Sequence, residues 1–94
     1  MTVIVPDWNL DVAGAQRLEK ELAETDGVVL VDLENVSFVA SSGLRVLLKH
    51  AQRLQVGGGE LRLCAANATV SDVFQMSGFD SILSVYPTRE QAEA

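Results

Sequence analysis

The segment Val28–Leu33 constrains the fold of this chain more than any other, because it is almost wholly apolar and does not alternate. A strand with one face in water alternates apolar and polar side chains, whereas a strand covered on both faces is apolar throughout. Val28–Leu33 is therefore predicted to be a central strand that is buried on both faces of its sheet.

Strand-like and helix-like segments alternate along the whole chain. Strands separated by helices pair in parallel through right-handed crossovers. The predicted fold class is therefore α/β: a single domain over residues 1–94, with one small sheet of about four strands, mostly parallel, and alternating helices packed on it. The predicted strands are Val3–Val5, Val28–Leu33, Glu60–Cys64 and Ile82–Val85. The predicted helices run from Asp11 to Gly27, from Ser41 to Leu54 and from Asn67–Thr69 to Gly78, with a final helical turn or two in Thr88–Ala94. Asp11 is expected to cap the first of them, whose apolar face would be Ala15, Leu18 and Leu22.

The charge balance excludes several classes of partner. Seven basic residues stand against 13 acidic ones, which gives a net charge of −6. Affinity for nucleic acid or for an anionic membrane surface comes from clustered Lys and Arg, and this chain has no basic run. No stretch approaches the ~20 apolar residues that cross a bilayer. With a single cysteine, Cys64, the chain is expected to work in the reducing cytoplasm, without nucleic acid and without membrane insertion.

The sequence offers no constellation for catalysis. Cys64 falls within a predicted strand, so a packed core thiol is expected rather than a nucleophile paired with His50. One Cys and one His cannot assemble a zinc site. Asp32 resembles the phosphoacceptor of a response regulator, but the acidic pair and the late lysine that this chemistry needs are missing. We expect neither an enzyme nor a cofactor or metal site. Trp8 either anchors an interface or caps the core.

Two serines at the predicted start of a helix form the most informative local pattern. The segment Val28–Leu48 brings a buried strand through a loop to Ser41 and Ser42. The first N–H groups of a helix are unpaired and its dipole is positive there, so a phosphate at this point gains hydrogen bonds and a favourable field. Serine at such a position is also an ordinary helix N-cap, and spacing does not distinguish the two.

The order of several motifs resembles a known family. The pattern D-L-x-x-V-x-F-[VI]-x-S-S-G-L-R-V-L-L is followed by a helix, a Gly-rich turn, E-L-R-L-C and V-x-D-V-F-x-x-S-G-F-D. Together these motifs, from Leu10 to Tyr86, resemble the STAS domain, which is typified by bacterial anti-sigma factor antagonists.

The resemblance implies a partner-switching mechanism in transcription regulation. In such proteins a GHKL-type serine kinase, which is also the anti-sigma factor, phosphorylates the serine at the start of this helix. The unphosphorylated form binds the kinase, and a metal-dependent serine phosphatase resets the cycle. The phosphoacceptor position falls on Ser41, with Ser42 as the second candidate. Gly43 is expected to let a partner backbone approach closely. The implied partner-binding residues are Asn35, Val39, Ala40, Ser42, Gly43, Leu44, Arg45 and Lys49.

Two departures from the family pattern favour an alternative function. Many antagonists carry Asp before the phosphoacceptor, where this chain has Ala40. Family members also have an additional strand before the one that matches Val3–Val5, and this chain is expected to lack it. The resulting edge strand invites pairing with a second copy of the chain. The alternative is a non-switching STAS adaptor subunit of a transporter or of another multiprotein complex.

Overall fold

A computed structural model describes residues 1–79 and 83–94 and confirms the alternation of strands and helices. The strands lie close to their predicted positions, except that β4 begins at Ser84; Ile82, where this strand was predicted to begin, lies outside the described residues. The elements in chain order are β1 (Thr2–Ile4), α1 (Val12–Ala23), β2 (Val28–Asp32), α2 (Ser41–Val56), β3 (Glu60–Cys64), α3 (Ala68–Met76), β4 (Ser84–Tyr86) and α4 (Arg89–Glu93).

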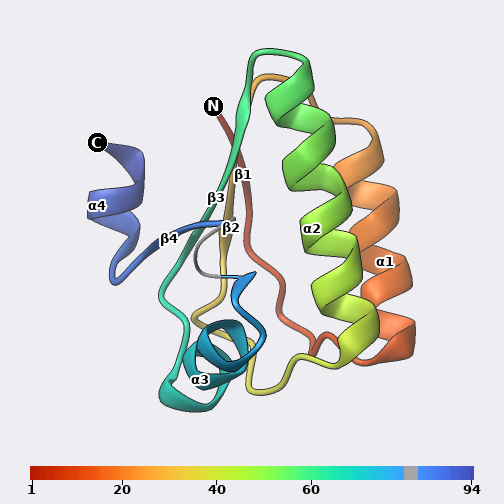
Figure 1. Cartoon of the computed structure of the whole chain (residues 1–94), viewed down its shortest axis with the longest axis vertical. Coiled ribbons are helices and arrows are strands. Elements are labelled where there is room, and N and C mark those ends of the chain that lie inside the picture. Colours follow the sequence, from red (N-terminus) through yellow and green to blue (C-terminus); the bar gives the residue numbers. More distant parts are fainter. Residues whose placement is uncertain (80–82) are drawn as a thin grey trace.

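The four strands form one parallel sheet in the order β1-β2-β3-β4 (Figure 1). Val29 of β2 pairs with Thr2 on one side and with Leu61 on the other. The backbone N–H of Leu33 continues this pairing by donating to the carbonyl of Cys64 at 2.9 Å. The prediction of a central strand at Val28–Leu33 is thus confirmed.

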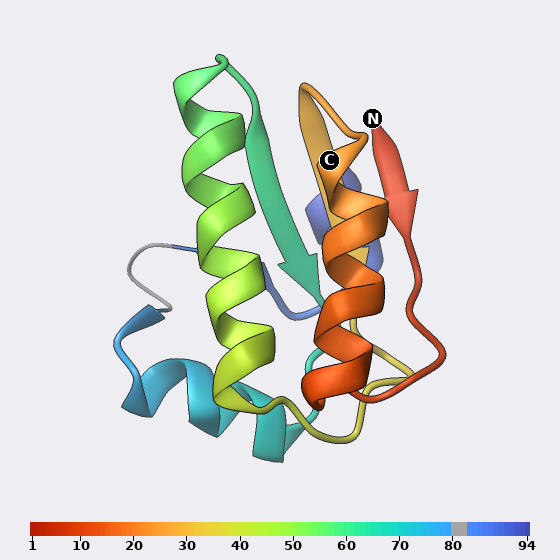
Figure 2. The ribbon, with the colours of Figure 1, turned by 90° about the vertical axis from the view of Figure 1, so that its right-hand side faces the viewer.

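Helices cover both faces of β2, which explains why its sequence does not alternate. α1 and α2 lie side by side on one face, α4 lies on the other, and α3 lies at one end of the sheet (Figures 1 and 2). Val29 and Val31 belong to the main core beneath α1 and α2. Leu30, pointing the opposite way, packs with Cys64 and with Ala92 of α4. Successive residues of β2 are therefore buried in two different cores.

The first helix has the cap and the apolar face that its sequence predicts. The Asp11 side chain accepts a hydrogen bond from the N–H of Gly14 at 2.8 Å, and so pairs one of the free donors of the helix start. Ala15, Leu18 and Leu22 are buried against the core, as predicted. α3 is capped in the same way by Asn67, and α4 by Thr88.

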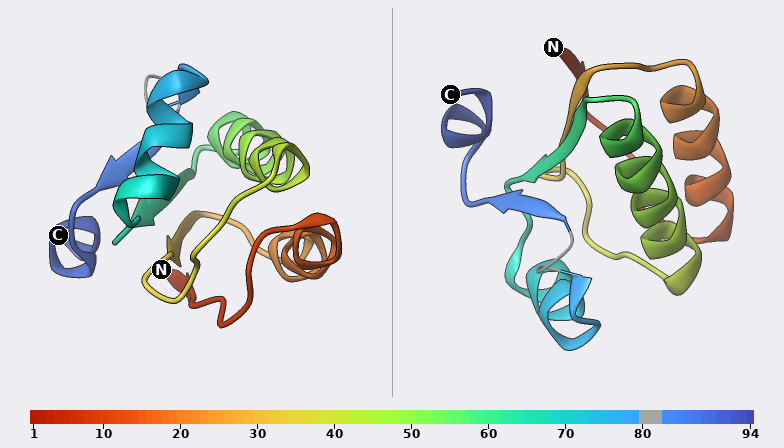
Figure 3. Two further views of the ribbon diagram at one scale, coloured as in Figure 1. Left: turned by 90° about the horizontal axis from the view of Figure 1, so that it is seen from below. Right: turned by 45° about the horizontal axis from the view of Figure 1, so that its top comes forward.

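β1 forms one edge of the sheet, and two apolar side chains are exposed there, one within β1 and one directly after it. Val3 is 36% and Val5 37% exposed, while Ile4 between them is buried. Figure 3 shows the N-terminus beside this edge. Pairing of this edge with a second copy of the chain remains a prediction. Among the described residues, no helix has the length and apolar character needed to span a bilayer.

Candidate functional site

The loop between β2 and α2 is fixed in place by the chain that leads into α1. The N–H of Leu10 donates to the carbonyl of Phe38 at 3.0 Å, and the N–H of Ala40 donates to the carbonyl of Leu10 at 2.8 Å. Leu10 and Val39 thereby form a short parallel bridge outside the main sheet. The starts of α1 and α2 are held side by side as a result.

α2 begins without a side-chain cap. Ala40 occupies the N-cap position in an extended conformation, and its side chain makes no capping hydrogen bond. Ser41 is the first residue inside the helix, so the interpretation of this serine as an ordinary N-cap is wrong. The first turn of α2 contains no acidic residue. The free N–H groups and the positive end of the dipole therefore have no compensating side-chain acceptor or charge here.

The two serines differ in their surroundings. Ser41 is exposed, so a phosphorylating enzyme can reach its hydroxyl. Ser42 is half-buried, and its Oγ is buried without a hydrogen-bond partner among the described residues. Exposure thus favours Ser41 over Ser42 as a site of modification.

The predicted partner-binding residues separate into exposed and buried ones. Asn35, Arg45 and Lys49 are exposed, and Ala40 and Ser42 are half-buried. The three others are buried in this structure, and their part in partner binding stays a prediction: Val39, Gly43 and Leu44.

Gly43 serves a contact within the chain, and its role in letting a partner backbone approach stays a prediction. A Cβ added at Gly43 would lie 2.9 Å from the Cβ of Leu10 and 3.0 Å from the Leu10 carbonyl oxygen. It would also lie 3.2 Å from a methyl group of Val39. The glycine is needed because the segment before α1 crosses α2 closely at this position.

Trp8 caps one end of the core. Its ring is half-buried and packs against the main core, and its Nε1 donates to the carbonyl of Gly14 at 3.0 Å. The guanidinium of Arg17 lies 3.8 Å from the ring centroid. Trp8 was predicted either to anchor an interface or to cap the core, and the structure shows it as a cap on the core.

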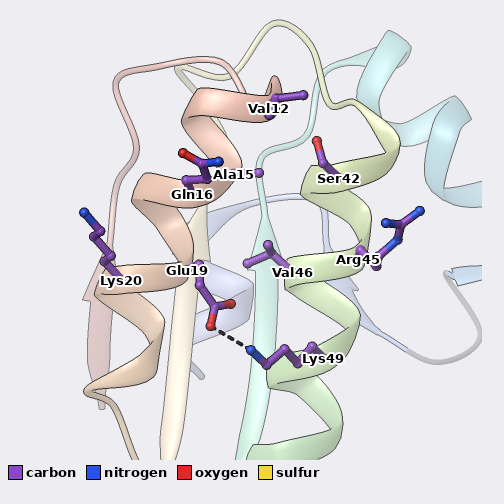
Figure 4. A pocket seen from close by; sticks show the side chains of 9 residues that line it. All are labelled: Val12, Ala15, Gln16, Glu19, Lys20, Ser42, Arg45, Val46 and Lys49. Carbon is purple, nitrogen blue, oxygen red and sulfur yellow. Dashed lines mark hydrogen bonds and ion pairs between the residues drawn. The ribbon is translucent and has the colours of Figure 1, made fainter.

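An open groove of about 510 Å³ lies between α1 and α2 and begins beside Ser42 (Figure 4). We call it the α1–α2 groove. Only three of its lining residues, Ser42, Arg45 and Lys49 of α2, were predicted site residues, because the side-by-side packing of the two helices is a tertiary feature. The sequence did contain one indication of this groove, because Val12 is an apolar residue outside the predicted apolar face of α1. In the structure Val12 is 64% exposed. The groove is lined by Val12, Ala15, Gln16, Glu19, Lys20, Ser42, Arg45, Val46 and Lys49.

A hydrogen-bond network joins α1 to α2 beneath one end of this groove. Glu19 accepts from Lys49 at 2.8 Å and lies 2.7 Å from Nε2 of the buried His50. Nε of Arg53 donates to Nδ1 of His50 at 3.0 Å, so the proton of a neutral His50 is on Nε2 and is donated to Glu19. Arg53 also donates to the carbonyls of Leu22 and Thr25 at the end of α1. This network joins the later turns of the two helices, while the bridge between Leu10 and Val39 holds their starts together.

The stability of this helix pair is expected to depend on the ionisation of Glu19. The hydrogen bond from Lys49, followed by those from His50, lowers the pKa of Glu19 against the opposing effect of burial. Because the pKa is lower in the folded than in the unfolded chain, the contribution is present above the unfolded value and lost as pH falls through the folded one. Glu19→Gln is expected to cost about 1 kcal/mol at neutral pH.

Urea unfolding of the wild type and of Glu19→Gln at neutral and at acidic pH measures this contribution. The difference between the two proteins should shrink as pH falls below the ordinary carboxylate range. A difference that stays constant down to acidic pH would show that the Glu19 charge plays no part. Glu21→Gln, an exposed change on the same helix, is the control.

Cys64 lies in the second core, against Leu30 and Ala92, and is a packed thiol as predicted. Burial, together with the nearby Asp32 carboxylate, raises its pKa to about 11. The nucleophilic thiolate is therefore scarce near neutral pH. In native protein the thiol should react with a disulfide reagent at least about 100-fold more slowly than in urea-unfolded protein. Equal rates in the two states would contradict the buried assignment.

Asp32 has a structural role at the end of β2. It is 1% exposed, its Oδ1 accepts from the N–H of Glu34 at 3.0 Å, and its Oδ2 lies 3.7 Å from the Arg89 guanidinium. No group of three or more His, Cys, Asp and Glu residues in the described part of the chain could hold a metal ion.

Comparison with known proteins identifies one family. The sequence model of the STAS domain matches residues 2–92. BtrV of Bordetella bronchiseptica, described as an anti-sigma factor antagonist, is 42% identical over 86 residues, which cover 87% of this chain and 74% of BtrV.

Solved structures share the fold. The crystal structure of a protein from Thermotoga maritima, also described as an anti-sigma factor antagonist, has a TM-score of 0.87 at 22% identity, covering 97% of this chain and 84% of the other. The anti-sigma factor antagonist SpoIIAA in its unphosphorylated form has a TM-score of 0.79 at 25% identity, covering 96% and 82%. SpoIIAA of Bacillus is also similar in its phosphorylated form, with a TM-score of 0.71 at 24% identity, covering 96% and 85%.

One neighbour is part of a transporter. The murine anion transporter Slc26a9 matches with a TM-score of 0.81 at 20% identity, over 96% of this chain and 16% of the transporter. At this identity the likeness concerns the fold alone.

Proposed function

This chain belongs to the STAS domain family, and from that premise we propose that it is an anti-sigma factor antagonist switched by phosphorylation of Ser41. In this proposal the unphosphorylated protein binds a GHKL-type serine kinase that is also an anti-sigma factor, and thereby frees the sigma factor. Phosphorylation releases the kinase, and a metal-dependent serine phosphatase restores the first state. Because the cycle consumes ATP and acts on transcription, we place it in the cytoplasm.

The observation that supports this proposal most is the exposed hydroxyl of Ser41 at the first position of a helix without a side-chain cap. A phosphate there adds a charge of about −1.5 to −2 beside N–H groups that no side chain occupies. Ala40 leaves them to the phosphate, so the modified chain can hold the group without unfolding α2.

The surroundings of Ser41 suit a protein partner. Phe38, which precedes it in the loop, is 50% exposed, although aromatic side chains of this size are usually buried. Arg45 follows Ser41 by one helical turn and is also exposed. Exposed aromatic and arginine side chains are typical of residues that contribute most to binding. A phosphate on Ser41 would change the charge of this surface where a partner has to dock.

Incubation with ATP and each GHKL-type serine kinase of the host organism, read by intact mass, tests the proposal. The wild type and Ser42→Ala should each gain one phosphoryl group, and Ser41→Ala should gain none. Phosphorylation of Ser41→Ala at another residue would contradict the site assignment. If no kinase modifies the chain, and Ser41→Asp and wild type both co-purify with the same transporter subunit, the adaptor function replaces the switch.

A further inference from the structure

The α1–α2 groove combines exposed apolar surface with an open shape. Val46 extends from α2 toward α1, and Val12 lies at the end near Ser42 (Figure 4). Val12 is more than half exposed, and Val46 is half-buried. The lining residues of α1 recur every third or fourth position from Val12 to Lys20. The groove thus follows the two parallel helices for about two turns, which suits a helical segment laid along it.

The charged side chains that line the groove are mostly basic, whereas the protein as a whole is acidic. They are Lys20, Arg45 and Lys49, against Glu19, which is paired with Lys49. The chain has a net charge of −6, yet residues 35–59, which include all of α2, contain no Asp or Glu. Lys20 and Arg45 extend outward on either side of the groove (Figure 4). Both are exposed, and neither has a hydrogen-bond or ion-pair partner among the described residues. The first turn of α2 lies beside the end of the groove near Ser42 and adds the positive end of the helix dipole there.

We infer that the α1–α2 groove binds an acidic amphipathic helix of the protein partner. One apolar side chain of that helix enters between Val12, Ala15 and Val46. Carboxylates on its two flanks reach Lys20 on one side and Arg45 on the other. That this partner is the kinase rests on the proposed function; the groove and its charge do not depend on it.

This arrangement links the groove to Ser41. Arg45 is four residues after Ser41, and residues at this spacing are neighbours on the surface of a helix. A phosphate on Ser41 can pair with Arg45 within the chain and places negative charge at the end of the groove. Phosphorylation thereby removes a contact of the acidic helix and repels it, without any change in the shape of the groove.

A displayed library of short helical peptides, panned against the unphosphorylated protein, tests the inference without knowledge of the partner. Enriched peptides should carry a large apolar residue with Asp or Glu on both sides. In NMR titrations they should shift the amide signals of Val12, Ala15 and Val46. Val46→Glu should weaken their binding at least about 10-fold, because it places an unpaired carboxylate in an apolar contact. Val56→Glu is the matched control, since Val56 is 90% exposed at the far end of the same helix.

Charge reversal gives a second readout that does not depend on packing. Arg45→Glu should weaken the selected peptides by roughly 5-fold, and replacing the facing acid of the peptide with Lys should restore that loss. Selection of basic peptides, or NMR shifts confined to another face, would overturn the inference. It would also be overturned by a wild-type dimer that Val46→Glu converts to a monomer, because the groove then serves a second copy. Phosphorylation of Ser41 is read separately by mass, so either proposal can fail alone.

Discussion

Ser41→Asp is expected to weaken binding of the proposed kinase partner by at least about 100-fold, which corresponds to roughly 2.8 kcal/mol. The added carboxylate would stand at the first position of α2, where a docked partner has to cover it. Burial of an unpaired charge in an interface is costly. The variant should nevertheless be at least as stable as the wild type, because a negative charge near a helix N-terminus is favourable. Loss of binding with retained stability separates a switch from a folding defect.

Titration calorimetry of the kinase with wild type, Ser41→Asp and Ser41→Asn measures this effect. Asn has nearly the shape of Asp without its charge, so Ser41→Asn should keep most of the affinity if charge is the signal. Equal loss in Asp and Asn would assign the effect to size. Unchanged binding of Ser41→Asp would remove Ser41 from the interface.

Gly14→Ala is expected to destabilise the protein by about 3 kcal/mol, although Ala is the better residue in a helix by about 1 kcal/mol. A Cβ at position 14 would overlap the carbonyl oxygen of Asn9 and would lie 2.8 Å from Cδ1 of Trp8. The Asn9 oxygen belongs to the backbone and the Trp8 ring is hydrogen-bonded to Gly14 itself, so neither group can move away cheaply. The turn before α1 would have to separate from the helix.

The matched control is the neighbouring position, because Ala13 is exposed on the same turn. Ala13→Gly should cost about 1 kcal/mol through helix propensity alone. The preference between Gly and Ala therefore reverses from one residue to the next. Chemical denaturation of the two variants would reveal this reversal, and a stabilised Gly14→Ala would refute the predicted overlap.

Local patterns in the sequence predicted the elements that depend on local chemistry. The cap at Asp11 and the buried face of α1 follow from helical spacing, and both are as expected. The unbroken apolar run of β2 correctly required cover on both faces, because Val29 and Leu30 point into different cores. The order of strands and helices was enough to give a parallel sheet.

What the sequence could not provide were contacts between segments far apart in the chain. Leu10 crosses α2 at Gly43, which sequence reasoning had assigned to a partner. Val39 and Leu44 were expected at a docking surface, but the same crossing and the core beneath α2 bury them. The α1–α2 groove was not predicted because neither helix forms it alone. The start of α2 differed by one position, since Ala40 rather than a serine is the N-cap.

The serial order of the sheet has a consequence for how the protein is made. Each strand pairs only with the strands that precede and follow it in the chain, so no strand pairing spans more than one strand–helix–strand unit. Synthesis from the N-terminus can therefore add one strand and one covering helix at a time to a growing sheet. By the time β4 has left the ribosome, the main core beneath α1 and α2 is complete, because it includes Val70 and Phe74 of α3 and Leu83 just before β4. The nascent chain should thus be competent to bind before its last helix, α4, is translated.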